Sequence, residues 1–251
     1  MEWTDRAIML GARRQGEGSL ILSLLTREHG RHKGLVRGGA RSRQRGLYEP
    51  GNIVTATWYA RLAEHLGLLR IEPGQSHAAM LLDDPLRLAC LEAAVAVVEA
   101  GLPERVAYPG IFDGLASLLG RLSADDGFAA LHLHWEVLVL ADLGYGLDLA
   151  SCAVTGGTSD LAWVSPRTGR AVSQPAGEAY RDRLLVLPRL LGGVGRGGGE
   201  VADLLDGLVL TGSFLERHVF APRGLALPEA RGRYVERLAR LGKVVRPGAV
   251  P

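Results

Sequence analysis

The sequence predicts an α+β protein in which a five-stranded β-barrel of the OB type is followed by a mostly α-helical domain. Two observations support this. Short segments rich in β-branched and aromatic residues, separated by glycines, fill residues 1–75. Runs rich in alanine and leucine, with helix start and stop signals, fill residues 76–251. An SH3-like barrel stays open as the alternative, because strand count alone does not separate the two folds.

The five strands are expected in short stretches bounded by glycine or proline. They are a segment around Trp3, Ile8 and Leu10 that stops at Gly11, then residues 19–26, 31–37, 53–59 and 66–71. Pro50-Gly51 precedes the fourth strand as a turn, and Pro73-Gly74 ends the fifth. In an OB barrel, residues 26–50 would then contain the third strand and the long loop after it.

Helices are expected where apolar residues lie between capping signals. Their ranges are 85–101, about 108–122, 127–144, 200–217 and 228–241. The third is apolar nearly all round, so it should be the central helix of the second domain. On it, His132 and Glu136 stand four residues apart. A surface pair or a core histidine with satisfied hydrogen bonds is the favoured interpretation, ahead of a functional site.

Composition limits the class of protein. The chain has 251 residues, of which 47% are hydrophobic and 22% charged, and its net charge is +2. Attraction to nucleic acid must therefore come from local clustering of charge. Two cysteines, Cys90 and Cys152, exclude a disulfide framework and fit a reducing compartment. The first residues lack the apolar core of a signal peptide, and no apolar run is long enough to span a membrane. We expect a cytoplasmic, nucleoid-associated protein.

Residues 26–50 form a basic stretch, and we expect it to bind DNA. Its seven cations, which are the candidate DNA-binding residues, are Arg27, Arg31, Lys33, Arg37, Arg41, Arg43 and Arg45. Interleaved glycines let the backbone turn sharply and approach a ligand closely. Arginine and lysine in such a cluster typically contact phosphates. The alternative is a solvated, charge-rich hairpin without a partner.

Aromatic side chains near this stretch are candidates for stacking on bases. They are Tyr48, Trp58 and Tyr59. OB folds bind single strands by combining backbone charge with such stacking. Because Trp58 and Tyr59 are adjacent in a strand, they point to opposite faces, and one of them should belong to the core.

No residue pattern indicates a metal, a cofactor or catalysis. Residues 150–176 have the outline of a zinc ribbon, but Cys152 is the only cysteine there, and tetrahedral zinc needs four ligands. We expect this insert to hold together by packing, through Leu161, Trp163 and Val172. Gly193, Gly195 and Gly198 match a dinucleotide-binding pattern, but they lie in a glycine-rich linker without the required preceding strand. Catalytic signatures are absent from the sequence, so we do not expect an enzyme.

The order and spacing of several motifs resemble the RecO recombination-mediator family. In the first domain these are Glu17-Gly-Ser19, Leu25-Thr-Arg-Glu-His-Gly30, Gly34-Leu-Val-Arg-Gly-Gly-Ala-Arg41, Pro50-Gly51 and Arg61 with Leu66-Gly67. In the second they are Leu143-Gly-Tyr-Gly-Leu-Asp148, Cys152-Ala, Val164-Ser-Pro, Gly169-Arg-Ala-Val-Ser173 and Leu210-Thr-Gly-Ser-Phe-Leu-Glu-Arg-His218, and these are similar to the proteobacterial variant. The resemblance covers nearly the whole chain.

The resemblance implies an OB domain, a helical domain and an insert that binds zinc in many members. Since three of the four cysteines are missing here, the metal does not carry over. It also implies a non-enzymatic role in DNA repair: binding single- and double-stranded DNA, annealing strands, and helping RecR load RecA onto DNA coated by single-strand-binding protein (SSB). An RNA-binding or purely scaffolding OB protein is the alternative function.

The family also docks the acidic, Phe-ending tail of SSB on its helical domain. In some members arginines near the end of the third helix serve this purpose, and the matching places here are near Leu133 and His134. A tail site needs an apolar slot and a cation for the carboxylates. The candidates are His132, His134, Arg217 and Arg223.

Overall fold

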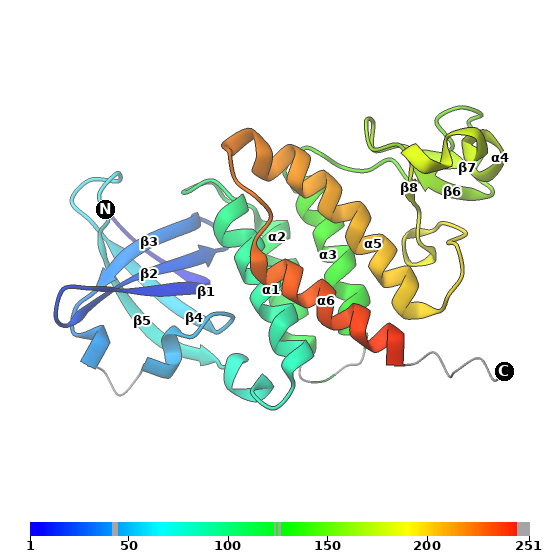
Figure 1. The fold of residues 1–251 in the computed structure, drawn as a ribbon. Helices are drawn as coiled ribbons and strands as arrows, with labels where there is room; N and C mark the ends of the chain where they lie inside the picture. Colours follow the sequence, from blue (N-terminus) through cyan, green and yellow to red (C-terminus); the bar gives the residue numbers. More distant parts are fainter. Residues whose placement is uncertain (42–44, 123, 125–126, 245–251) are drawn as a thin grey trace. The chain divides into compact units, whose positions relative to one another are not determined.

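The chain divides into two compact units, Met1–Phe128 and Ala129–Pro251 (Figure 1). In this computed structural model, residues 1–41, 45–122, 124 and 127–244 are described. The first unit holds a β-barrel and two helices. The second is built mainly on the helices α3, α5 and α6 and a small three-stranded sheet.

The barrel has five strands that close in the order β1-β2-β3-β5-β4, which confirms the predicted OB-type barrel. They are β1 (Glu2–Gln15), β2 (Ser19–Thr26), β3 (Gly30–Val36), β4 (Ile53–Tyr59) and β5 (Leu68–Gln75). Neighbours pair antiparallel except β3 and β5, which meet in a short parallel pairing of Leu35 with Leu68. Alternate residues of these strands point inward and form one apolar core, in which Met9, Leu22 and Trp58 are almost completely buried.

Strand β1 is longer than the sequence predicts because it pairs with two neighbouring strands, β4 and β2. Its first half pairs with β4, from Glu2 opposite Tyr59 to Ile8 opposite Ile53, and its second half pairs with β2 as far as Gln15. A bulge between Met9 and Gly11 bends the strand where it passes from one partner to the other. The predicted stop at Gly11 was therefore wrong: the glycine marks a bend within the strand.

Strand β5 also runs beyond its predicted end. Pro73 and Gly74 lie within it, opposite a register shift between Ile53 and Thr55 of β4. A proline lacks the N–H that a regular ladder needs, so an irregular position of this kind tolerates it. At Gly74, a Cβ atom would come within 2.3 Å of the Ile53 carbonyl oxygen, so the close approach of the two strands requires glycine.

Helices α1 (Pro85–Gly101) and α2 (Pro109–Arg121) complete the first unit. Asp84 caps α1, because its side chain accepts hydrogen bonds from the N–H groups of Leu86 and Arg87. The inner face of α1 packs on β1 and β2. The barrel core is thus covered by helix on one side, and Figure 1 shows the β1–β2 hairpin loop projecting on the opposite side.

The second unit is built on α3 (Phe128–Asp142), α5 (Glu200–Phe214) and α6 (Glu229–Val244) (Figure 1). A π-helical stretch, Leu215–Phe220, continues α5 beyond residue 217, where the sequence predicts the end of this helix. Glu136 of α3 is completely buried and accepts hydrogen bonds from Arg231 of α6, at 2.7 and 2.8 Å, and from Thr211 of α5. This carboxylate ties the three helices together, and removing one partner would leave a buried charge uncompensated.

The insert between α3 and α5 is a small sheet in the order β7-β6-β8. Its strands are β6 (Leu161–Val164), β7 (Ala171–Ser173) and β8 (Leu185–Val186), and the four-residue helix α4 (Gln174–Gly177) follows β7. Leu161 and Val172 are buried as expected. The ring of Trp163 lies so close to Gly177 that a Cβ there would be 2.3 Å away. The third strand of this sheet, β8, lies beyond the range 150–176 expected for the insert.

Across the described residues, none of the helices has both the length and the apolar character that crossing a membrane requires.

Candidate nucleic-acid interface

The N-terminal half of the basic stretch, residues 27–33, turns toward the helices of its own unit. Arg27 forms an ion pair of 2.9 Å with Asp113 of α2, and Lys33 one of 2.7 Å with Glu104 in the loop after α1. The Arg31 Nε donates a hydrogen bond to the Leu102 carbonyl oxygen at 3.0 Å. These three cations hold the barrel against α1 and α2.

The electrostatics of these pairs agree with a structural role. The hydrogen bond with Asp113 raises the pKa of Arg27, and the same bond lowers the pKa of the Asp113 carboxyl. At Glu104, the hydrogen bond from Lys33 holds the pKa below its ordinary value, although partial burial acts in the other direction. Each charge is therefore already matched by a carboxylate of the same unit, which leaves less of it for an anionic ligand.

Backbone contacts fix the same half of the stretch. Gly30 has a φ of +71°, and a Cβ there would come within 2.1 Å of the Val106 carbonyl oxygen in the α1–α2 loop. The Arg105 N–H donates to the Arg31 carbonyl oxygen at 2.8 Å. The β2–β3 turn is thus docked onto this loop by main chain as well as by side chains.

The C-terminal half, residues 37–45, has different surroundings. Arg37 and Arg45 are exposed, and neither has an ion-pair partner within the described part of the chain. The backbone of Arg41 lies in the short 3-10 turn η1 (Gly39–Arg41), but its side chain and all of Arg43 lie outside the described residues. A hydrogen bond of 3.1 Å from the Ala40 N–H to the Gly18 carbonyl oxygen places η1 beside the β1–β2 hairpin.

Two hollows on this side of the barrel each bring together one arginine from a strand and one from a turn. One, of about 430 Å3, is lined by Arg14 of β1 and Arg45 of the turn η2 (Arg45–Tyr48). The other, of about the same volume, is lined by Arg37 and by Arg70 of β5. Tyr48 lines both, so the two hollows adjoin.

Sequence reasoning missed Arg14 and Arg70, because they lie far from the basic stretch in the chain. Arg70 also contacts Glu72 at 3.3 Å, while both side chains remain largely exposed. A signal existed for the first of them: the doublet Arg13-Arg14 directly precedes the hairpin glycine Gly16. Glu49 also lines the first hollow and is the one carboxylate among its described lining residues.

The three candidate aromatics have different positions. Tyr48 is 7% exposed and Trp58 2%, and both belong to the barrel core. The Trp58 indole N–H donates to the Leu66 carbonyl oxygen at 3.0 Å. Tyr59 is 54% exposed. The expected alternation of Trp58 and Tyr59 is confirmed, and Tyr59 alone of the three presents its ring to solvent.

The candidates for tail binding lie in the second unit. His132 is completely buried, with its Nε2 3.9 Å from the Glu136 Oε1, and burial lowers the pKa of this histidine to about 4. It cannot reach a peptide in this structure. His134, Arg217 and Arg223 are exposed. The Arg217 guanidinium donates to the Pro166 carbonyl oxygen at 2.9 Å, so it lies beside the insert.

Cys152 is buried in the insert, where its sulfur accepts a hydrogen bond from the Ser173 N–H at 3.2 Å. Burial raises the pKa of the thiol, but hydrogen bonds from Ser173 and Thr155 outweigh burial and lower it to about 6. No group of three or more histidine, cysteine or acidic side chains is placed to hold a metal ion anywhere in the described ranges.

Comparison with known proteins identifies the family. The model named Recombination protein O N terminal matches residues 1–76, and the model named Recombination protein O C terminal matches residues 82–225. The chain belongs to the RecO family. Its likeness extends to whole proteins. A DNA repair protein RecO of Rhodospirillum centenum is 53% identical over 239 residues, which are 94% of each chain. One of Phenylobacterium zucineum is 47% identical over 97% of this chain and the full length of its own.

These RecO matches confirm the resemblance expected from the sequence and assign the chain to DNA repair and recombination. The matched regions contain the basic stretch, the two hollows and the helices α3 and α5 of the second unit, whereas α6 follows the end of the second match.

Proposed function

We propose that this RecO chain is a non-enzymatic recombination mediator that binds single- and double-stranded DNA through residues 1–75, anneals strands, and helps RecR load RecA onto SSB-coated DNA. The observation that carries the DNA-binding part is the pair of adjoining hollows, which are lined by Arg14 and Arg70 from two strands and by Arg37 and Arg45 from two turns. Phosphate contacts by such arginines give affinity without sequence preference.

The interface differs from the basic stretch as a whole. Arg27, Arg31 and Lys33 are paired with carboxylates of the same unit, so they contribute to the fold more than to DNA affinity. Arg37 and Arg45, with Arg14 and Arg70 beside them, form the phosphate-binding surface. We include Arg41 and Arg43 because they lie between Arg37 and Arg45 in the chain. Tyr59, on β4, is the proposed stacking residue.

Charge reversal at Arg37, Arg41 and Arg43 tests the proposal. The triple change to glutamate should weaken binding to every DNA sequence about equally and flatten its dependence on salt. Each lost phosphate contact lowers the log–log slope by about 0.7 on single strands, so three contacts lower it by about 2. Fluorescence anisotropy with labelled single-stranded DNA, repeated across salt concentrations, measures both quantities. An RNA of matched sequence, added as competitor, separates this function from RNA binding.

A variant with the same net charge but a different location is the control. Arg167, Arg181 and Arg183 are exposed residues of the insert, and changing them to glutamate gives the same shift in net charge. This control should keep nearly the full salt slope. If both triple variants lose slope equally, or if neither does, the arginines of the barrel are not the DNA surface.

The proposed partners are RecR and the C-terminal tail of SSB. The tail is acidic and ends in phenylalanine, so it needs an apolar slot and a cation. Arg217 is the favoured cation, because Tyr145 and Phe214 each stack on His218, the next residue, and so place aromatic surface beside it. His134 is the alternative. Its Nδ1 is 2.8 Å from the Ala130 carbonyl oxygen one turn earlier on α3.

Substitution of each residue distinguishes the two cations. If Arg217 is the cation, a tail peptide should bind Arg217→Ala more weakly than the wild type and bind His134→Ala as tightly as the wild type. If His134 is the cation, the order of the two variants should reverse. Titrating the peptide against both variants decides between them. If the peptide binds equally well to both variants, the tail docks on another surface.

A further inference from the structure

The hollow that contains Arg37 and Arg70 has walls that a phosphate site does not need. The other side chains of its described lining are all apolar or aromatic, and two glycines complete it. They are Leu35, Val36, Tyr48, Leu68, Leu69 and Ile71. Its volume of about 430 Å3 falls within the range of roughly 300–1,000 Å3 that is typical of small-molecule sites. A phosphate group gains nothing from apolar walls, so these walls fit a flat, largely apolar part of a ligand.

This hollow lies where two strands of the barrel are barely paired. Strands β3 and β5 pair at one position, Leu35 with Leu68, and the Leu35 N–H donates to the Gly67 carbonyl oxygen at 3.0 Å. No further pairing joins these two strands in the described part of the chain. Because main-chain groups alternate in direction along a strand, those of Ile71 point to the same side as the Gly67 carbonyl. The hollow is therefore bordered by the N–H and C=O groups of a strand edge.

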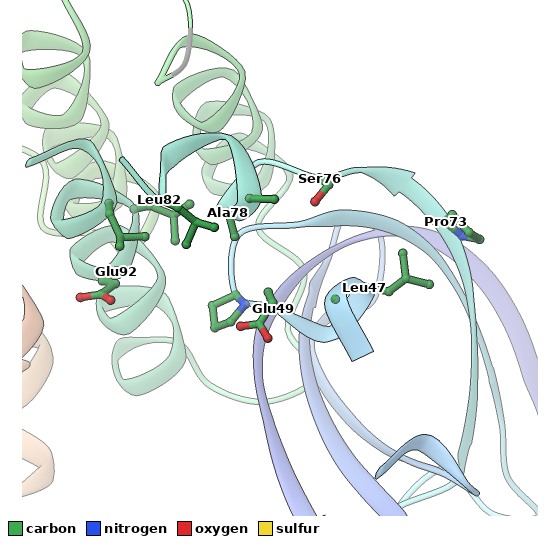
Figure 2. A pocket seen from close by; sticks show the side chains of 12 residues that line it. Leu47, Glu49, Pro73, Ser76, Ala78, Leu82 and Glu92 are labelled. Atoms are coloured by element: carbon green, nitrogen blue, oxygen red, sulfur yellow. The ribbon is translucent and has the colours of Figure 1, made fainter. Parts of the chain in front are cut away.

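Tyr48 forms the wall of the hollow toward the barrel core, and its position is fixed. It is 7% exposed, and its ring packs among the core residues of the barrel. The turn η2 that carries it is anchored by the buried Asn52, whose amide Nδ2 donates to the Gly46 carbonyl oxygen at 2.7 Å. Figure 2 shows its chain neighbours Leu47 and Glu49 beside a separate hollow on the side of α1. A wall fixed in this way is preformed, which lowers the entropic cost of binding.

The charged groups of the lining are cations. Arg37 is exposed and has no ion-pair partner within the described residues. Arg70 contacts Glu72 at 3.3 Å, but its side chain is 79% exposed, and Glu72 does not belong to the lining. At Gly38, which also lines the hollow, nothing lies within 4 Å of where a Cβ would be, so the wall is open there. An anionic chain can therefore pass the opening close to both arginines.

We propose that this hollow holds one unpaired nucleobase of single-stranded DNA, with the neighbouring phosphate on Arg37. The inference rests on the proposed function and adds which part of the DNA is recognised. The apolar walls cover the faces of the base, and its hydrogen-bonding edge meets the main-chain groups of Ile71. A base in a duplex enters only after it is flipped out, at a cost in stacking and pairing. The hollow therefore favours single strands, whereas phosphate contacts alone do not depend on the bases.

A free strand edge also fits a β-strand of a protein partner. The two exposed arginines favour the nucleic acid, because its backbone supplies the anion that they lack.

A strand without bases tests the proposal on the full-length protein. Two single strands of equal length are compared, one with thymine at every position and one with the same sugar–phosphate backbone and no bases, so that their charges are equal. By fluorescence anisotropy, the wild type should bind the thymine strand about tenfold more tightly. The dependence on salt should be the same for both strands, because their phosphates are the same.

Filling the hollow should remove most of this preference. Leu68→Phe and Val36→Phe each enlarge a side chain of the lining, and each should reduce the preference to about threefold or less, the remainder being stacking on Tyr59. Affinity for the abasic strand and for duplex DNA should stay unchanged. Leu82→Phe, at an exposed leucine of the same unit outside the lining, is the matched control and should keep the full preference. Circular dichroism checks that each variant is folded.

Cross-linking of the wild type locates the base directly. A single strand that carries 5-iodouracil, irradiated in the complex, should cross-link to residues 35–39, 48 or 68–71. Cross-links confined to other residues overturn the proposal.

The binding data separate the base site from the proposed function. If the wild type binds both strands equally with a full salt slope, the base site is wrong and the DNA surface stands. If it binds neither strand, both are wrong. A preference that survives in both folded filling variants overturns the base site and leaves the strand edge to a protein partner. An equal loss of affinity for the abasic strand in those variants also overturns it, because the hollow then holds backbone.

Discussion

The two halves of the basic stretch contain the same kinds of residue and have opposite surroundings. Residues 27–33 meet Asp113 and Glu104 of the helical part of their unit, and their charges are matched. Residues 37–45 lie beyond the end of β3, where Arg37 and Arg45 face solvent beside Arg14 and Arg70. A cluster of cations in a sequence therefore does not define a binding surface. The carboxylates that meet each cation decide its role.

Two glycines give the strongest test of this difference, because Gly30 and Gly38 share a φ of +71°. An alanine at either position has the same backbone strain, on the order of 1 kcal/mol. At Gly30 the added Cβ also collides with the backbone of Val106, whereas nothing lies within 4 Å at Gly38. Gly30→Ala should lower the free energy of unfolding by about 3 kcal/mol or more, and Gly38→Ala by about 1 kcal/mol.

Urea denaturation followed by circular dichroism measures both values. Similar losses of unfolding free energy in the two variants would mean that the β2–β3 turn is not held against the α1–α2 loop. The two halves of the basic stretch, residues 27–33 and 37–45, would then not differ in their contribution to stability.

Removing one cation from each half should separate stability from DNA affinity. Arg31→Met keeps the apolar stem but loses the hydrogen bond to Leu102, and it should cost about 2 kcal/mol of unfolding free energy. Arg37→Met should change stability by less than about 0.5 kcal/mol. The order reverses for DNA: Arg37→Met should lower the salt slope by about 0.7, and Arg31→Met should leave it nearly unchanged.

Denaturation and salt titration on the same preparations check this prediction. The result that contradicts it is a loss of salt slope in Arg31→Met as large as that in Arg37→Met, with both proteins folded.

The smallest expected effect concerns pH. The pKa of Glu104 is lowered from 4.5 in the folded state, chiefly by Lys33. The pair therefore stabilises the fold fully above about pH 4.5 and loses this contribution as pH falls through the lower, folded pKa. Because both side chains are 40% exposed, the contribution should be about 0.5 kcal/mol.

Measuring the free energy of unfolding of the wild type and of Glu104→Gln from pH 7 to pH 3 tests this contribution. The difference in unfolding free energy between the two proteins should vanish at the acidic end. Arg37 has no carboxylate partner within the described residues. The difference in unfolding free energy between Arg37→Gln and the wild type should therefore stay constant across the same pH range. A flat profile for Glu104→Gln would show that the pair does not contribute.

The sequence by itself determined the elements and the family. Ser19–Thr26, Ile53–Tyr59 and Pro85–Gly101 have the predicted bounds, because local signals define them: glycine and proline at strand ends, and an Asp-Pro start for the helix. The motifs around Gly30 and Gly34 resemble the RecO family, and the family matches confirm this.

Tertiary structure decided what each residue of these elements does. Arg31 and Arg37 look alike in the sequence, but the acidic groups near Arg31 come from the far end of α1 and the loop after it. Tyr48 could stack on a base from its position in the chain, yet the barrel buries it. Arg14 and Arg70 join the basic surface only because β1 and β5 are brought to the same side. Local signals fix backbone conformation, whereas charge pairing and burial depend on residues that only folding brings together.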